Sequence, residues 1–525
     1  MLRREQRSGI TEGLSTMSEA VQQTKRPRLA QNSIYGLLSW LLPALPALVV
    51  TPIVLHELGN EEYGLYSAIL GITGYFFTIG VGRIAAKYVA EYSGLAEGHR
   101  ASQFVSATII VTIIASVVSL AILFAATPYV VDKVLLIEPA LQDTAITGIW
   151  IAGALILFTA VGQVWQSVLQ GLHRFDIYFW ITNVASLLLS VGLVIIALEG
   201  GGVLLLLGWA AINGGLVLAS SFASTKRAWP DLELTFRIPN ADWRQVSIYA
   251  ASLIGYQVCG VTVLFFERGW IIREFGMQNV AYYLIPLNLG ILLLGFAGSA
   301  LSALFPALNA RMGDADAVGN LYRRASKFVI VFVILAIVGA IGSGRTFLYL
   351  WLGGNFAEKS WTLLVVHTIT FGIISLGLIL WQLVETYRRA PITVYANLAV
   401  VLITIPLMIV LGRSDGLLGV AIGRLVGLAP YIVLWVYVER RFTGGFSIRF
   451  WLGMAGRLLI PVTLAYVVLW LGALYLNPAW LTWIGTVVLG TFVYFASLFA
   501  IGAFDPAEIA VFKNVFFRRL ADAGF

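Results

Sequence analysis

The residues of this chain with the clearest chemical potential are charged side chains inside long apolar stretches. Arg424 lies in the segment G-V-A-I-G-R-L-V-G, and the neighbours Glu267 and Arg268 stand near the end of another apolar stretch. Arg83 and Lys87 are four residues apart near the end of a third, on one face of the helix expected there. A charge in hydrocarbon is costly, so such residues usually mark a functional site. Guanidinium and ammonium groups bind anions, and we therefore predict a site for an anionic group such as a phosphate.

The same residues also have structural interpretations, which the sequence leaves open. Arg83 and Lys87 lie near a helix end, where such side chains extend to lipid phosphates as readily as they bind a ligand. Arg268 can equally pair with a neighbouring helix, and Gln257 can hydrogen-bond either a sugar or another helix. Arg424 lies eight residues into its run, about 12 Å of helix from the boundary. That depth favours a role in a cavity for Arg424.

Other kinds of chemistry lack the residues that they need. The chain has no phosphate-binding Gly-Lys-Ser/Thr loop, its four histidines are scattered, and its one cysteine, Cys259, cannot form an intramolecular disulfide. No Cys or His spacing suggests a metal site, and the connecting loops are too short for a soluble catalytic domain. We therefore expect a transporter rather than an enzyme, with no resident cofactor or metal. A coupling ion, Na⁺ or H⁺, stays open.

Long apolar runs must position the charged residues. With 59% apolar and 12% charged residues, the chain cannot bury its apolar surface in a soluble core. A spanning helix needs about 20 mostly apolar residues, and we count fourteen such runs in the sequence. The expected spans are 33–56, 63–85, 104–127, 145–169, 177–198, 202–222, 246–272, 279–304, 327–344, 361–384, 391–411, 416–437, 456–476 and 482–503. The sequence thus predicts an all-α integral membrane protein with about fourteen transmembrane helices.

Five short patterns recur in the same order in the two halves of the chain. They are S-I-Y at 33 and 247, E-x-G at 57 and 274, R-A-S at 100 and 324, W-Q at 165 and 381, and N at 183 and 397. The offsets are 214, 217, 224, 216 and 214 residues. Two six-helix lobes with the same orientation form a parallel pseudo-twofold repeat, the plan of transporters with a substrate site between the halves.

The runs and the loop charges predict the division and orientation of the chain. The expected segments are a polar cytoplasmic tail at 1–30, an N-lobe at 31–222, a cytoplasmic linker at 223–245, a C-lobe at 246–438, two further helices at 456–503 and an amphipathic interfacial helix at 505–521. Most of the 34 Lys and Arg residues face one side if both termini are cytoplasmic, as the positive-inside rule requires. Basic loops beside anionic lipid explain the net charge of +7, so we expect no nucleic-acid partner.

Several segments resemble one family of membrane transporters. They are N-S-I-Y-G at 32–36, E-L-G-N-E-E-Y-G-L-Y at 57–66, Q-G-L-H-R-F-D at 170–176, F-P-A-L-N-A-R-M-G-D at 305–314 and L-W-L-G-G-N-F-A at 350–357. In this order they resemble polysaccharide flippases of the O-antigen type, members of the multidrug/oligosaccharidyl-lipid/polysaccharide (MOP) superfamily. The resemblance spans roughly residues 30–500. It implies two six-helix lobes around a central cavity, with two C-terminal helices outside them.

The resemblance also implies a function, namely flipping of a polyprenyl-diphosphate-linked oligosaccharide from the cytoplasmic to the outer leaflet by alternating access, for cell-surface polysaccharide synthesis. The expected partners are an undecaprenyl-diphosphate-linked glycan, membrane lipids and polysaccharide polymerase or assembly proteins. The expected location is the bacterial cytoplasmic (inner) membrane. The candidate substrate-binding residues are Arg424, Arg268, Arg83, Lys87, Glu267 and Gln257.

Two other classes of protein stay open as alternatives. A cation-coupled multidrug exporter of the same superfamily would be expected to have twelve helices and membrane-embedded acidic residues. The fourteen runs and the cationic rather than acidic interior weigh against it. A membrane-embedded, polyprenyl-dependent glycosyltransferase or polymerase would need catalytic groups in large outer loops, and the outer loops here are short.

Overall fold

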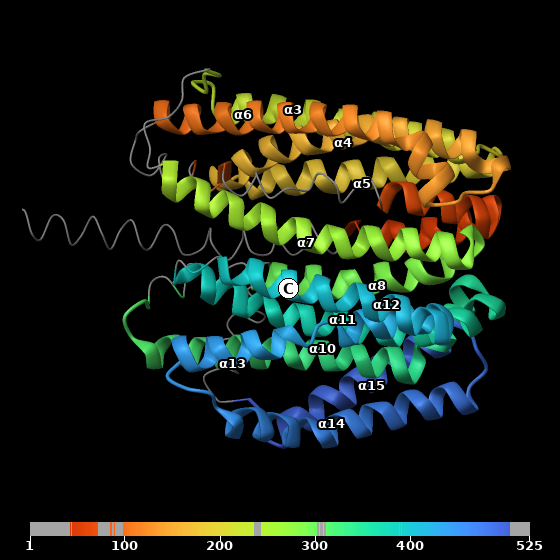
Figure 1. Cartoon of the computed structure of the whole chain (residues 1–525). Coiled ribbons are helices and arrows are strands. Elements are labelled where there is room, and N and C mark those ends of the chain that lie inside the picture. The colour runs from red at the N-terminus through yellow and green to blue at the C-terminus, as the bar shows by residue number, and fades with distance from the viewer. Residues whose placement is uncertain are drawn as a thin grey trace, which may run out of the picture. The chain divides into compact units, whose positions relative to one another are not determined.

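Helices joined by short loops make up nearly all of the described structure (Figure 1). The computed structural model describes residues 42–43, 45–71, 85, 86, 89, 98–235, 243–301, 304, 308, 311–387, 389 and 391–504. No strand occurs among these residues. The expected tail at 1–30 and the expected amphipathic helix at 505–521 lie outside them.

The helices follow the apolar runs of the sequence. Residues 45–71 are helical on both sides of a turn at Gly59, whose φ is +74°. The first half continues with α3 (Gly98–Tyr129), the π-helical turn η1 (Val130–Val134), α4 (Pro139–Gly171), α5 (Phe175–Leu198) and α6 (Val203–Ala228). Next come α7 (Trp243–Phe275), the short 3-10 helix η2 (Met277–Asn279) and α8 (Val280–Ala300). The last helices are α10 (Ala315–Leu352), α11 (Gly354–Thr386), α12 (Pro391–Val426), α13 (Pro430–Phe442), α14 (Ile448–Tyr475) and α15 (Trp480–Ala500). The run expected at 327–344 is the middle of the much longer α10.

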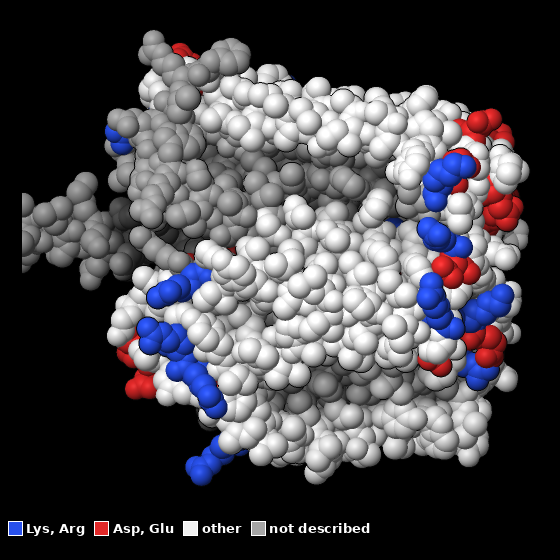
Figure 2. Space-filling view, viewed as in Figure 1, with Lys and Arg blue, Asp and Glu red and all other residues white. Residues whose placement is uncertain are grey.

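The distribution of charge along the helices is that of a membrane protein. Ten helical segments among the described residues are long and apolar enough to cross a membrane. Figure 2 shows charged side chains gathered toward the ends of the helices, with mostly uncharged side chains between those ends. A hydrocarbon layer about 30 Å thick imposes this pattern on spanning helices. The chain is therefore the all-α, multi-pass membrane protein that its sequence predicts, and the total of fourteen spans stays a prediction.

Helix α12 is interrupted by a tight turn. Asp415 and Gly416 leave helical geometry, and Gly416 has a φ of +64°, a left-handed conformation that glycine adopts without strain. The break falls between the runs expected at 391–411 and 416–437, so α12 has two limbs. The residues of the second run continue into α13 after a short turn at 427–429.

Small residues let the two limbs of α12 touch. Gly419, Gly423 and Gly427 form a stripe along the second limb at a spacing of four residues. An added Cβ at these positions would overlap, in order, Leu411, Met408 and Thr404 of the first limb. The residue numbers fall on one limb as they rise on the other, so the limbs are antiparallel. Glycine stripes of this kind allow close packing in lipid, where no hydrophobic effect drives helices together.

By its internal contacts the chain divides into two compact units. The first comprises Met1–Ala281, Gly298–Ala303 and Ala390–Leu398. In it α4 packs against α3 and α6, and α6 packs against α5. Trp165 of α4 belongs to its buried core. The linker expected at 223–245 separates the two halves of the sequence repeat, whereas these units are defined by contacts. The expected lobe boundary therefore stays a prediction.

The second unit comprises Tyr282–Ala297, Leu304–Arg389 and Ala399–Phe525. In it α10 packs against α11 and α14, and α14 packs against α15. Tyr494 of α15 is fully buried, and its hydroxyl donates to the carbonyl oxygen of Val331 on α10 at 2.9 Å. Helix α10 thus holds the last two helices within this unit.

Matching backbone and side-chain details confirm the internal repeat. The side-chain amides of Asn183 and Asn397 each donate to the carbonyl four residues earlier, at 2.8 and 2.7 Å. After α4 the amide of Arg174 donates to the carbonyl five residues earlier, and after α11 the amide of Arg389 does the same, both at 2.9 Å. The chain therefore leaves α4 and its counterpart α11 by the same kind of turn.

Candidate functional site

Arg424 is buried in the second limb of α12, with 6% of its surface exposed. Its guanidinium carbon lies 5.0 Å from the centroid of the Phe371 ring on α11. The negative face of an aromatic ring attracts a cation, most strongly where water is excluded. Gly423 and Gly427 flank Arg424 and pack against the first limb of α12. Arg424 is therefore buried among side chains that hold its charge at a fixed place, and its depth in the membrane stays a prediction.

His367 lies one helical turn before Phe371 on the same face of α11, and its side chain is fully buried. Its ring lies 4.7 Å from that of Tyr283 on α8, at an interplanar angle of 83°. Neither ring nitrogen has a hydrogen-bond partner among the described residues. Arg424 lies against Phe371, which is one turn away from His367 on α11. A buried polar group without partners is costly to maintain, which marks His367 as a candidate functional residue beside Arg424.

Close helix packing encloses these side chains. An added Cβ at Gly290 of α8 would lie 2.8 Å from the Phe371 ring and 3.1 Å from the carbonyl oxygen of His367. Helices α8 and α11 therefore touch without an intervening side chain. We refer to Arg424, His367, Phe371 and Tyr283 as the Arg424 cluster. Sequence analysis missed His367, because a lone histidine in an apolar run carries no spacing signal.

Glu267 and Arg268 of α7 are also buried, with 0% and 3% of their surfaces exposed. They belong to the first unit. The guanidinium of Arg268 lies against Gly71, where an added Cβ would overlap its Nε atom. The glycine thus provides the space that the arginine occupies. The sequence predicts a charged position here, and the structure places both charges inside protein rather than at its surface.

The other predicted site residues have no side-chain description. Gln257 lies on α7, but its side chain is outside what the structure describes, and Arg83 and Lys87 lie wholly outside the described residues. Their assignment to the site stays a prediction.

Glu439, near the end of α13, corrects the expectation of a cationic rather than acidic interior. It lies two residues past the run expected at 416–437, and only 2% of its surface is exposed. Its carboxylate accepts hydrogen bonds from the hydroxyl of Tyr322 at 2.9 Å, from the indoles of Trp435 and Trp451 at 2.8 and 2.7 Å, and from the amide of Ser447 at 3.2 Å. With Glu267, the described interior therefore holds two buried carboxylates. The role of Glu439 could not be predicted from the sequence, because its hydrogen-bond donors come from three separate segments.

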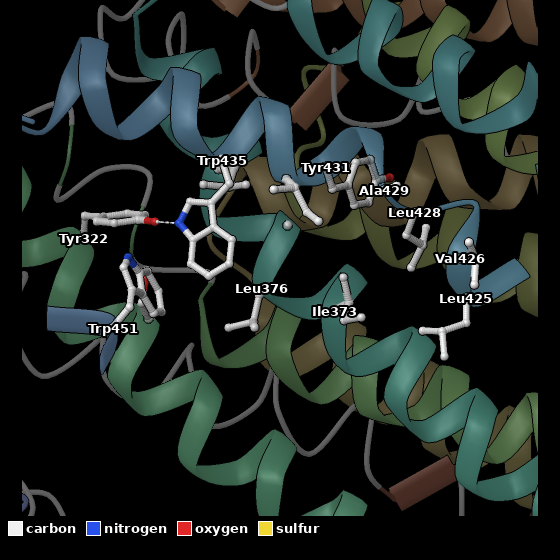
Figure 3. A pocket seen from close by; sticks show the side chains of 14 residues that line it. Tyr322, Ile373, Leu376, Leu425, Val426, Leu428, Ala429, Tyr431, Trp435 and Trp451 are labelled. Carbon is white, nitrogen blue, oxygen red and sulfur yellow. Dashed lines mark hydrogen bonds between the residues drawn. The ribbon is translucent and has the colours of Figure 1, made fainter. Parts of the chain in front are cut away.

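An apolar cavity of about 440 Å³ lies beside Glu439 and its partners. Figure 3 shows Tyr322, Trp435 and Trp451 at one end of it, and Leu425 and Val426 toward the other. The hydrogen bonds to Glu439 fix these aromatic side chains, so the carboxylate stabilises one wall of the cavity. Such a lining suits hydrocarbon rather than a sugar, whose hydroxyl groups would lose their water there.

The charged residues of the described interior suit binding rather than bond-making. Arg268 and Arg424 are permanent cations, and a guanidinium presents several donors in a fixed plane to a phosphate or carboxylate. Among the described residues, no three His, Cys, Asp or Glu side chains gather as a metal site requires. Arg268 in the first unit and Arg424 in the second are therefore buried guanidinium groups suited to an anionic group.

Comparison with known sequences gives the relatives of the chain. A family described as polysaccharide biosynthesis protein matches residues 29–312, more than half of the chain. A Shigella flexneri protein described as an O-antigen transporter is 21% identical over 421 residues, which are 78% of this chain and 98% of that protein.

Solved structures share the fold. The lipid II flippase MurJ, in an inward closed conformation, has a TM-score of 0.67 at 16% identity and covers 94% of this chain and 99% of its own. An outward-facing multidrug resistance transporter of the MATE family has a TM-score of 0.61 at 17% identity. The alignment covers 80% of this chain and 96% of that one. A MOP superfamily transporter from Pyrococcus furiosus has a TM-score of 0.60 at 17% identity, and the alignment covers 80% of this chain and 96% of that one. At these identities the likeness establishes the MOP fold.

Proposed function

Because the chain belongs to the polysaccharide biosynthesis protein family, we propose that this multi-pass membrane transporter is a flippase for a lipid-linked oligosaccharide. Its substrate is a glycan joined through a diphosphate to a polyprenyl lipid, with undecaprenyl as the bacterial form. It moves this substrate from the cytoplasmic to the outer leaflet by alternating access, for cell-surface polysaccharide synthesis.

The Arg424 cluster is the observation that carries this proposal. A lipid-linked sugar cannot cross about 30 Å of hydrocarbon alone, because its hydroxyl groups and phosphates would lose their water. A carrier must offer a cation within the membrane, and Arg424 is a buried cation on a candidate span. Phe371 and the glycine stripe hold it in place. We assign it to the diphosphate.

Arg268 is the second residue assigned to substrate, and its neighbour Glu267 has a different role in the proposal. A buried carboxylate within a spanning helix is the kind of group that binds Na⁺ or H⁺ in transporters. Glu267 is fully buried on α7. We therefore propose Glu267 as the site at which a coupling ion acts.

The proposed location is the bacterial inner membrane, with both termini cytoplasmic.

A cation-coupled multidrug exporter is the second candidate, and specific observations favour it. The described interior holds two buried carboxylates, Glu267 and Glu439, and the MATE fold aligns with a TM-score of 0.61. Chain coverage favours the flippase instead. The MurJ alignment covers 94% of the chain and leaves about 32 residues unaligned. Helices α14 and α15 together have more residues than that, 28 and 21, so the alignment must include part of them. The MATE alignment covers only 80%.

Deleting the gene tests the substrate class. A flippase deletion leaves the lipid-linked glycan on the cytoplasmic leaflet, where a membrane-impermeant probe cannot reach it from outside, and surface polysaccharide disappears. An exporter deletion leaves the glycan unaffected and raises sensitivity to lipophilic cations. An enzyme deletion changes the length or composition of the glycan. Arrival of the glycan at the outer leaflet at the normal rate, with no redundant carrier present, would overturn the proposal.

A further inference from the structure

The N-terminal parts of α10 and α14 line a second cavity, of about 320 Å³, within the second unit. We call it the basic pocket, because it is lined by five cationic side chains: Arg323, Arg324, Lys327, Arg449 and Arg457. Asn320, Phe450, Gly453 and Met454 complete the lining, which contains no acidic residue. In Figure 2 the side of the second unit where these two helices begin is rich in Lys and Arg.

The two helices present these side chains on single faces. Arg323, Arg324 and Lys327 lie within two turns of α10, at the spacing of neighbours on one face. On α14, Arg449 and Arg457 are two turns apart, and Gly453 lies midway between them. An added Cβ at Gly453 would meet nothing within 4 Å. The missing side chain of Gly453 is thus part of the open volume of the pocket.

This arrangement carries an electrostatic cost in the absence of an anion. Like charges three or four residues apart on a helix destabilise it. Arg449 stands in the first turn of α14, which has no acidic residue, although the positive end of the helix dipole favours anions there. A negatively charged ligand in the pocket offsets both effects.

Two of the cations are held in place, which distinguishes the pocket from a solvated basic surface. Lys327 has only 8% of its surface exposed, and its Nζ lies 5.3 Å from the centroid of the Phe504 ring. Arg323 donates to the side-chain oxygen of Asn320 at 3.0 Å. A site whose side chains are already ordered loses less entropy on binding.

We propose that the basic pocket binds the phosphate groups of an anionic membrane phospholipid, and best a lipid with two phosphates. The pocket lies at the same end of two candidate spans, the level at which lipid headgroups lie. Helix α14 exposes Leu452 between the pocket residues and Leu459 and Ile460 just beyond them, and these side chains offer apolar surface for acyl chains. Five positive charges match a doubly charged headgroup better than a single phosphate. This inference does not depend on which substrate the protein transports.

Lipid binding to the purified full-length protein tests the proposal. The probes are cardiolipin with two phosphates, phosphatidylglycerol with one, and zwitterionic phosphatidylcholine, each measured by native mass spectrometry in detergent. We expect affinity to fall in that order. The double variant Arg449→Gln, Arg457→Gln should bind cardiolipin at least tenfold more weakly, since both side chains are exposed and their loss leaves the core intact. The matched double variant Arg440→Gln, Arg441→Gln, which removes two exposed charges outside the pocket, should bind as the wild type does.

A pair of glycine variants separates the pocket from general charge attraction. Gly453→Phe fills the pocket and should weaken cardiolipin binding at least tenfold. Gly456→Phe changes an equally open glycine of α14 that does not line the pocket, and should have no effect. Equal weakening by both charge variants, or equal binding by the two phenylalanine variants, would overturn the proposal. Competition by inorganic diphosphate as strong as that by cardiolipin would also overturn it, since it would identify a soluble ligand.

Discussion

The two halves of the chain share their turns and differ in what lies between them. Positive φ angles recur at matching turns: Gly59 and Gly276 at +74° and +82°, Leu136 and Gly353 at +53° and +89°, and Gly200 and Gly416 at +73° and +64°. These pairs are 217, 217 and 216 residues apart. Left-handed backbone at three corresponding places means that each half reverses its chain in the same way. The repeat is thus a property of the backbone as well as of the sequence.

The difference lies in the helices that follow the last pair of turns. At an offset of 216 residues, Arg424 corresponds to Gly208 on α6. The glycine stripe at 419, 423 and 427 corresponds to Val203, Leu207 and Ala211. The first half therefore has neither the buried cation nor the close-packed stripe beside it. One backbone plan serves both halves, and the residues proposed to meet an anion at this position belong to the second half alone.

The largest expected effect comes from filling the glycine stripe. Gly423→Leu places a side chain where the backbone of Met408 lies, so the limbs of α12 must separate. Overpacking of this kind costs about 3 kcal/mol. The control in the first half is Gly208→Leu, at the glycine next to Leu207, which is the counterpart of Gly423. This side chain enters open space and should shift stability by less than about 0.5 kcal/mol. Thermal unfolding in detergent measures both, and equal losses would show that the halves do not differ here.

Removing the charge of Arg424 has the next largest effect, on transport rather than on stability. Arg424→Gln should lower flipping at least tenfold at unchanged protein abundance, because the buried cation is lost. Arg424→Lys should keep part of the activity, since the charge survives without the planar fork. A fluorescent lipid-linked glycan in proteoliposomes measures the rate. Full activity of an abundant Arg424→Gln protein would remove the residue from the site, and loss of abundance would instead indicate a structural role.

Glu439 tests a second asymmetry, because its counterpart at an offset of 216 residues is Ala223. Glu439→Gln removes the charge and turns an amide group toward the hydrogen-bond donors around it. Losing charge-assisted hydrogen bonds should lower unfolding stability by about 2 kcal/mol. Glu358→Gln, at an exposed ion pair with Arg345, serves as the control and should have no measurable effect. Equal stability of the Glu439→Gln protein would contradict a structural role for this carboxylate.

The smallest expected effect is that of His367→Ile, which gives the second half the residue that the first half has at Ile151. The imidazole is fully buried without a hydrogen-bond partner among the described residues. Replacing it with an apolar side chain should raise stability by about 1 kcal/mol. A loss of similar size, measured by thermal unfolding, would show that the ring makes a stabilising contact.

Patterns local in the sequence predicted the fold, and contacts between distant segments determined the site. Hydropathy located the helices and separated the runs 391–411 and 416–437, the two limbs of α12, because this signal lies within a few neighbouring residues. The surroundings of Arg424 could not be read in this way. Its depth followed from its run, but Phe371 and His367 reach it from another helix. The burial of Glu439 was missed for the same reason, since its partners Tyr322 and Trp451 lie on other helices, 117 and 12 residues away in the sequence.

The tight turn of α12 also bears on how the chain enters the membrane during synthesis. Only Asp415 and Gly416 leave helical geometry between the limbs, so the polar segment that has to be carried across the bilayer is short. The glycine stripe then pairs residues at most 23 positions apart, from Thr404 to Gly427. Contacts this local form early, because little chain entropy is lost in closing them. The hairpin can therefore insert as one unit and carry Arg424 into the bilayer beside a helix already packed against it.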